Sequence, residues 1–210
     1  MVALPQTVAQ PFRAASGTHI AMTGAMLPRR PRIKGFAYTG LHRYSLTICT
    51  KDRQPFFRER DVVAMVLLTL QQSAAAHDFA LVAYCFMPDH AHAVVSAATE
   101  TADLRRFVSK WKQRSGYAYR QKTGAFLWQP SYFDHVLRDD EETWRAARYV
   151  LENPVRKGLV QVFDEYPYSG SDVFTREQLR EIWQRGQGSS PALPNYRTAG
   201  LKPCATEQQG

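Results

Sequence analysis

The sequence predicts an α+β fold, in which a central antiparallel sheet follows the ferredoxin-like split β-α-β order and a C-terminal helix is added. Two observations support this class. Short β-rich apolar runs occupy residues 44–50, 79–87 and 90–96, and apolar residues recur at helical spacing in the segments between and after them. The predicted order is therefore strand, helix, strand, strand, helix, strand, followed by the added helix.

The composition indicates a globular protein with a basic surface. Lys and Arg number 27 against 19 Asp and Glu, which gives a net charge of +8 and favours a polyanionic partner. The three cysteines have neither disulfide-framework nor zinc-finger spacing, so a reducing cytoplasmic location is expected. The longest apolar run is too short to span a bilayer, so we expect no membrane role.

The chain divides into three predicted parts. Residues 1–35 form a flexible basic N-terminal extension that includes Arg30, Arg32 and Lys34, although residues 1–27 also fit a plain solvated leader. Residues 36–175 form the folded domain. Residues 176–210 contain a short helix and then a Gly, Ser, Pro and Gln-rich tail that we expect to be disordered.

The first half of the domain predicts a strand, a helix and a hairpin. The run 44–50 alternates as a strand does, and Asp61 can cap a helix that continues to about His77. Residues 79–87 and 90–96 then form two antiparallel strands around the corner at 87–89. On the second of these strands His90 and His92 share one face about 6.6 Å apart by rise, so they can bind one cation together. Two structural histidines remain the alternative.

The next helix begins at Thr101 or Asp103 and has an apolar stripe along one side. Its other side is basic, and two interpretations are open: an ordinary solvated face or a ridge that binds DNA phosphates. The basic side chains are Arg105, Arg106, Lys110, Lys112 and Arg114. The aromatic segment 126–138 follows and ends in a short strand; its rings fit either a core or a surface that stacks on unpaired bases.

The last predicted helix begins at Asp139, with Glu142 placed for a capping box, and ends at Asn153-Pro154. On a helical wheel Tyr149 points about 140° away from Trp144, which belongs to the apolar stripe. Tyr149 is therefore poorly placed for the core, and it is either a plain surface tyrosine or a functional one. The turn-rich residues 155–174 are expected to fold back on the sheet.

Three motifs in this order resemble single-tyrosine HUH transposases of the insertion-sequence type, and most closely the REP-associated tyrosine transposases. They are Met87-Pro88-Asp89-His90-Ala91-His92, Trp128-Gln129-Pro130-Ser131-Tyr132-Phe133-Asp134-His135, and the run from Tyr149 to Val160. The resemblance covers roughly residues 36–170. Two departures stand out, because Ala91 replaces a bulkier apolar residue and Asp89 stands where Asn is frequent.

The resemblance implies a role for each matching residue. Tyr149 would be the nucleophile, His90 and His92 would bind a divalent metal ion, Mg²⁺ or Mn²⁺, and Asn153 would be a third ligand. His135 would support the site or contact DNA, although a structural histidine is an alternative. Tyr117, Tyr119 and Tyr132 are rival nucleophiles by residue type, but none of them has Asn or Gln four residues later with a helix stop after it.

The implied function is metal-dependent cleavage and rejoining of single-stranded DNA at or near hairpins through a 5′-phosphotyrosine intermediate. Two alternatives remain open: a hairpin-binding regulator that does not cleave DNA, and a metal-dependent hydrolase that uses an activated water. The expected partner is single-stranded DNA with a hairpin. The sequence does not distinguish a monomer from a homodimer.

Overall fold

A computed structural model describes residues 35–184 of the chain. The predicted basic residues Arg30, Arg32 and Lys34, most of the predicted extension and the tail beyond Gln184 lie outside the described residues. Within residues 35–184, no helix combines the length and the apolar character that crossing a membrane requires.

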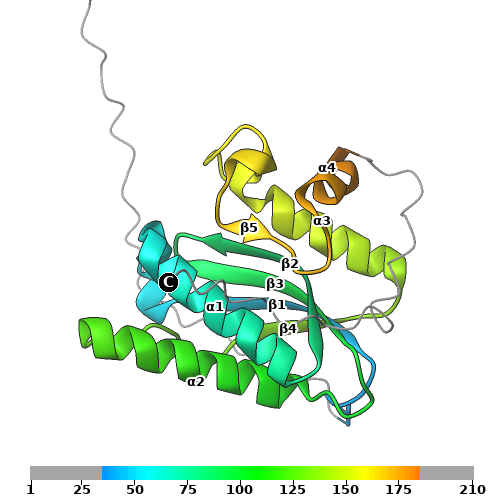
Figure 1. Cartoon of the computed structure of the whole chain (residues 1–210), viewed down its shortest axis with the longest axis horizontal. Coiled ribbons are helices and arrows are strands. Elements are labelled where there is room, and N and C mark those ends of the chain that lie inside the picture. Colours follow the sequence, from blue (N-terminus) through cyan, green and yellow to red (C-terminus); the bar gives the residue numbers. More distant parts are fainter. Residues whose placement is uncertain (1–34, 185–210) are drawn as a thin grey trace, which may run out of the picture.

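The fold is one antiparallel sheet with helices on both faces (Figure 1). The strands lie in the order β4-β1-β3-β2-β5. They are β1 (Arg43–Cys49), β2 (Phe79–Met87), β3 (His90–Ala97), β4 (Phe133–Leu137) and the short β5 (Ser169–Gly170). The helices are α1 (Arg60–Ala76), α2 (Leu104–Thr123), α3 (Asp140–Arg156) and α4 (Arg176–Gln184). The predicted element order and the split β-α-β fold are confirmed.

Helices α1 and α2 cover one face of the sheet, and α3 and α4 cover the other (Figure 1). Each face has its own apolar cluster. The small side chains of Ala91 and Ala93 face α1 and α2, where Val66 and Trp111 are fully buried. On the opposite face Val94 packs in the cluster that α3 and α4 complete. The predicted close approach of a helix to the alanine face of β3 is therefore confirmed.

The helix starts follow from their caps. The carboxylate of Asp103 accepts a hydrogen bond from the backbone N–H of Arg106 at 3.1 Å, and Asp139 accepts one from Glu142 at 2.7 Å. The predicted cap at Asp61 is wrong, because Glu59 holds the N-cap position of α1. Asp61 instead lies in the first turn, where its negative charge interacts favourably with the helix dipole.

The predicted end of the last helix is also wrong. Helix α3 continues through Pro154 to Arg156, although proline removes one backbone N–H from the hydrogen-bond pattern. The end of the helix is closed by other donors, since Lys157 N–H bonds to the Asn153 carbonyl and Leu159 N–H to the Pro154 carbonyl. The following segment returns to the sheet as predicted, where β5 pairs with β2.

Candidate active site

Two imidazoles converge at the start of β3. His92 lies opposite Cys85 of β2, a residue of the cluster beneath α3, so the histidine pair faces α3. The Nε2 atoms of His90 and His92 are 3.0 Å apart, and the two rings are nearly perpendicular. The predicted common face of the two histidines is confirmed, and both rings present the same nitrogen to one point.

Neighbouring side chains orient both rings. Oδ1 of Asp89 lies 2.5 Å from Nδ1 of His90, and the other carboxylate oxygen of Asp89 lies 3.2 Å from the guanidinium of Arg53. Strand β1 places Thr47 directly opposite His92, with its hydroxyl 3.0 Å from Nδ1 of that ring. Each Nδ1 therefore has an oxygen partner, and each Nε2 points toward the other ring.

The surroundings keep the two rings neutral. Burial lowers the pKa of His92 to about 3, and the charges of His90 and Arg53 act in the same direction. Burial also lowers the pKa of His90, although Asp89 opposes this shift. Burial acts to raise the pKa of Asp89, but its hydrogen bond to His90 and the charge of Arg53 outweigh that effect and lower the pKa. Asp89 is thus an ionised acceptor at neutral pH.

The ionised carboxylate fixes the proton on His90. Because Asp89 can only accept, the neutral His90 ring donates from Nδ1 and keeps a lone pair on Nε2. His92 can adopt either tautomer, since the Thr47 hydroxyl can donate to Nδ1 or accept from it. When the Nδ1 proton is on His92, both Nε2 lone pairs are available to a cation.

Helix α3 places Tyr149 beside this pair. The centroid of its ring lies 6.1 Å from that of His92, and the two rings are nearly perpendicular. The residue is 46% exposed, whereas Trp144 and Leu151 of the same helix are buried, as the wheel predicted. The guanidinium of Arg156 lies over the Tyr149 ring, 4.9 Å from its centroid. The phenol therefore has solvent access, an imidazole and a cation around it.

Asn153 lies one turn after Tyr149 and is 6% exposed. Its side-chain nitrogen donates a hydrogen bond of 2.8 Å to the Tyr149 carbonyl. This bond fixes the orientation of the amide group, so the side-chain oxygen of Asn153 is the atom left to act as an acceptor or ligand.

The residues around the pair fit a divalent metal ion. Two adjacent ligands of an octahedral ion with bonds of about 2.1 Å lie about 3.0 Å apart, and the two Nε2 atoms have that separation of 3.0 Å. The carboxylate on His90 Nδ1 is a common support for a metal-binding imidazole. In residues 35–184 no three His, Cys, Asp or Glu side chains form a metal-binding group, so a third protein ligand would be an amide such as that of Asn153.

His135 is paired with the first turn of α3. It belongs to β4, and its Nε2 atom lies 2.8 Å from a carboxylate oxygen of Glu142 in the first turn of α3. Glu142 also accepts a hydrogen bond from the backbone N–H of Arg138, and this bond, with that of His135, lowers the pKa of Glu142. The structure therefore places His135 at the N-terminal end of the helix that carries Tyr149.

The basic side chains of α2 are not brought to the histidine pair, because α2 covers the opposite face of the sheet (Figure 1). Four of them are exposed: Arg105, Arg106, Lys110 and Arg114. Lys112 differs, since its ammonium donates to the carbonyls of Gln129 and Ser131 at 2.6 and 3.1 Å. Burial lowers the pKa of Lys112 to about 8. Lys112 thus holds the loop before β4 against α2.

Sequence reasoning did not identify Thr47, Arg53 and Arg156 as neighbours of the site. The signal for Arg156 was present, because it lies seven residues after Tyr149 and therefore on the same side of a helix that continues past Pro154. Thr47 and Arg53 come from β1 and the loop after it, and their proximity depends on the register of β1 against β3.

Comparison with known proteins finds related sequences. Residues 39–153 match the family model described as "Transposase IS200 like", and the matched range includes both histidines, Tyr149 and Asn153. A candidate REP-associated tyrosine transposase of Haemophilus influenzae is 27% identical over 164 residues, covering 71% of this chain and 89% of the relative. The REP-associated tyrosine transposase of Escherichia coli is 26% identical over 108 residues, covering 50% of this chain and 60% of the relative.

A solved structure has the same fold. It is a REP-associated tyrosine transposase bound to a REP hairpin, with a TM-score of 0.59 and 19% sequence identity. The match covers 75% of this chain and 93% of that one.

Proposed function

The chain belongs to the IS200-like transposase family, and from this premise we propose that it cleaves and rejoins single-stranded DNA with Tyr149 as the nucleophile. The substrate is DNA that contains a hairpin, as in the solved relative. Cleavage depends on Mg²⁺ or Mn²⁺ held by His90, His92 and Asn153.

The reaction is a phosphoryl transfer. The phenol oxygen of Tyr149 attacks the scissile phosphorus, the bond from phosphorus to the 3′-oxygen breaks, and the departing 3′-oxygen takes up a proton. The products are a 5′-phosphotyrosine and a free 3′-hydroxyl. Attack of a 3′-hydroxyl on the phosphotyrosine reverses the bond changes and rejoins the strand. The phenol proton leaves to solvent, to which Tyr149 is open.

The site residues have separable tasks in this step. His90, His92 and Asn153 would hold a divalent ion, which would supply positive charge to the phosphoryl oxygens. Asp89 keeps the proton of His90 on Nδ1. The Thr47 hydroxyl can donate to Nδ1 of His92 or accept from it, so it permits either tautomer of that ring. Arg156 places a positive charge over the Tyr149 ring, where it favours the negative charge of the phosphate.

One observation carries the proposal more than any other. A half-exposed tyrosine from α3 lies beside an imidazole pair from β3, with 6.1 Å between the ring centroids of Tyr149 and His92. A plain surface tyrosine requires no such neighbours. The two Nε2 atoms lie at hydrogen-bond distance from each other, and a proton on Nδ1 of His92 would leave both Nε2 lone pairs to a cation.

The test is covalent capture of a labelled hairpin oligonucleotide with unpaired flanks. The wild-type protein incubated with Mn²⁺ should form a protein–DNA adduct that survives denaturing electrophoresis. Tyr149→Phe should form no adduct and should bind the hairpin as before, since it loses a single hydroxyl. Tyr119→Phe is the matched control: it removes the hydroxyl of a rival tyrosine that is 6% exposed, and adduct formation should continue.

Each other outcome identifies a different function. Hairpin binding by the wild type without any adduct would favour the regulator that does not cleave DNA. Metal-dependent cleavage that persists in Tyr149→Phe would favour hydrolysis by an activated water. An adduct that persists in Tyr149→Phe would overturn the assignment of the nucleophile.

A further inference from the structure

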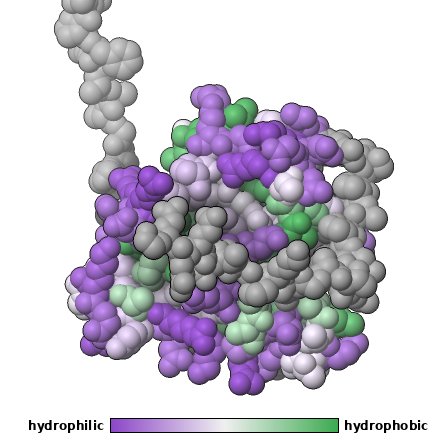
Figure 2. All heavy atoms as spheres, in the orientation of Figure 1, coloured by the Kyte–Doolittle hydropathy of each residue, from purple (hydrophilic) through white to green (hydrophobic). Residues whose placement is uncertain are grey.

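A groove of about 670 Å³ lies on the other side of the molecule from the histidine pair, between α2 and the loop that leads to β4. We call it the α2 groove and define it by Arg105, Tyr117, Arg120, Phe126, Trp128 and Pro130. Hydrophilic residues gather along the edge of the molecule where α2 lies (Figure 2). From Arg105 to Arg120 the helix is about 22 Å long at 1.5 Å per residue, so the groove is extended.

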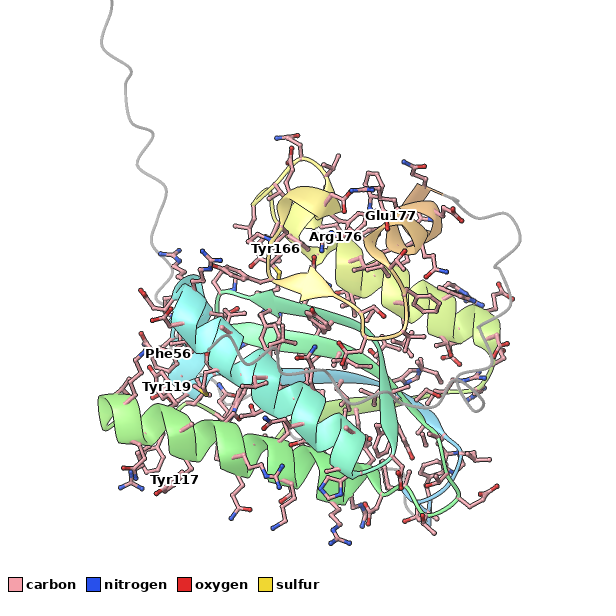
Figure 3. The ribbon with its side chains drawn as sticks, viewed as in Figure 1. Phe56, Tyr117, Tyr119, Tyr166, Arg176 and Glu177 are labelled. Carbon is pink, nitrogen blue, oxygen red and sulfur yellow. The ribbon has the colours of Figure 1, made fainter. Side chains whose placement is uncertain are left out.

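Two large aromatic rings of this groove are open to solvent. Tyr117 is 66% exposed and Phe126 is 61% exposed, the two highest values among the exposed large hydrophobic residues described. Tyr117 lies on the outer side of α2, whereas Tyr119 points inward to Phe56, with the ring centroids 5.2 Å apart (Figure 3). An isolated exposed ring needs no explanation, but two rings in one groove make a surface on which planar groups can stack.

One of these rings carries a cation, and a second arginine of the groove stacks on a buried ring beside it. The guanidinium of Arg120 lies over the Phe126 ring, 4.8 Å from its centroid, and Arg105 lies in a similar way over Tyr38 at 4.6 Å. Guanidinium groups stacked on rings keep their N–H donors free at the edge of the plane, where phosphate oxygens can be bound. The α2 groove therefore combines aromatic faces with positive charge, which is the composition of surfaces that bind unpaired nucleic acid.

The wall of the groove is rigid. The Trp128 indole N–H donates to the Ser115 hydroxyl at 2.9 Å, and Lys112 holds the carbonyls of Gln129 and Ser131. The loop is thus fixed to α2 by three side-chain hydrogen bonds. A wall fixed in this way presents Trp128 and Pro130 with a reduced ordering cost when a ligand binds.

The same wall is hydrogen-bonded to β1, the strand next to the histidine strand. The backbone N–H of Gln129 bonds to the Cys49 carbonyl at 3.0 Å, and Cys49 is the residue of β1 paired with His90. Two strand spacings, about 10 Å, therefore separate the wall from the backbone of the histidine strand. A DNA strand that passes from the histidine face around Gln129 and Pro130 would enter the α2 groove.

We propose that the α2 groove binds unpaired nucleotides that flank the DNA hairpin, with bases stacked on Tyr117 and Phe126 and phosphates held by Arg105 and Arg120. This inference rests on the proposed function, because the flank is part of the DNA that Tyr149 cuts. The positive charge and the open ring faces favour a nucleic acid over an apolar peptide.

The test measures the affinity that a flank adds. Fluorescence anisotropy in EDTA compares a blunt hairpin with hairpins that carry about six unpaired nucleotides on the 5′ or the 3′ side, a length within the usual range for such surfaces. At least one of the two flanks should raise the affinity of the wild-type protein for the hairpin. The double variant Tyr117→Ala/Phe126→Ala should lose that gain, about 5-fold or more, and should bind the blunt hairpin as the wild type does.

Matched variants separate the contributions of the Tyr117 ring and of the Arg120 charge to the gain in affinity. Tyr117→Phe keeps the ring and should keep the gain, whereas Tyr117→Ala should reduce it. Arg120→Gln should also reduce it, while Arg114→Gln, an exposed arginine of α2 that does not line the groove, should not. The substituted aromatic side chains are exposed, so the variants should fold, and a thermal melt by circular dichroism checks this point.

A flank-dependent gain that is equal in the wild type and the double variant would overturn the inference and leave the groove to a protein ligand. The absence of any gain from either flank would overturn it as well. These failures are distinct from failure of the proposed function. A wild-type protein that forms no adduct but loses its flank gain in the double variant would overturn the cleavage proposal alone.

Discussion

Arg156 lies with its guanidinium over the ring of Tyr149, 4.9 Å from the centroid, on a helix that continues past a proline to bring the two side chains together. The contact is a cation–π interaction in the resting protein. In the proposed reaction the same cation lies close to the phosphate that the phenol oxygen attacks.

The first prediction concerns this cation. Arg156→Gln should slow formation of the phosphotyrosine adduct by about 100-fold, the usual effect of losing one group that stabilises developing negative charge. Single-turnover gel assays at saturating DNA measure this rate. Arg156→Lys should restore part of it, whereas Arg148→Gln should leave it unchanged, because Arg148 is paired with Glu152 of the same helix. Equal rates for the Gln and wild-type proteins would remove Arg156 from the reaction.

The second prediction concerns the metal ion. His90→Ala and His92→Ala should each abolish Mn²⁺ binding in isothermal titration calorimetry, since each removes one of two converging nitrogens. Asp89→Asn should weaken Mn²⁺ binding by about 10- to 100-fold, because the amide no longer holds the Nδ1 proton of His90 by charge. His135→Ala should bind Mn²⁺ as the wild type does, since the structure pairs His135 with Glu142. Full Mn²⁺ affinity in His92→Ala would refute the ligand assignment.

The third prediction concerns Lys112. Its pKa is lowered from 10.5 to about 8 in the folded protein, so between these values the unfolded chain binds a proton that the folded protein has lost. The contribution of Lys112 to the free energy of unfolding should therefore increase as the pH rises through this window. This contribution should be smallest below pH 8, where the buried ammonium is charged.

Urea unfolding at several pH values checks this sign. The difference in unfolding free energy between the wild type and Lys112→Met should increase from about pH 8 to about pH 10.5, the range that the shifted pKa sets. Lys110→Met replaces an exposed lysine of the same helix and controls for the loss of one charge. A difference that falls with pH would show that Lys112 is stabilised as a cation.

The fourth prediction concerns the support of the tyrosine helix. Leu151 is fully buried between α3 and the sheet, so Leu151→Ala should lower the unfolding free energy by about 2–5 kcal/mol. It should also slow adduct formation at temperatures where the protein stays folded, because α3 positions Tyr149. Leu159→Ala, at an exposed site after the helix, should change neither quantity.

Much of the fold was predictable because its signals are local. The alternation of β1, the alanine face of β3 and the caps at Asp103 and Asp139 all follow from short sequence patterns. The convergence of His90 and His92 was predictable for the same reason, since residues two apart on a strand share a face. The position of Tyr149 outside the core followed from the helical wheel.

Most of the parts that were missed depend on contacts between distant segments, and one depends on local hydrogen bonds after a proline. The pattern of α2 shows which side of the helix is polar, but it does not show which face of the sheet the helix covers, so its arginines could not be placed relative to His90. Thr47 reaches His92 through strand register. The continuation of α3 past Pro154 depends on hydrogen bonds formed after the proline, including that from Leu159.

The two apolar clusters lie on opposite faces of one sheet, and this arrangement has an energetic consequence. Changes in unfolding free energy caused by Leu70→Ala beneath α1 and Leu151→Ala beneath α3 should add, since the two side chains belong to different clusters. Substitutions in the α3–α4 layer, which bears the proposed nucleophile, can then change the stability of that layer while the contribution of the α1–α2 layer to the free energy of unfolding stays the same.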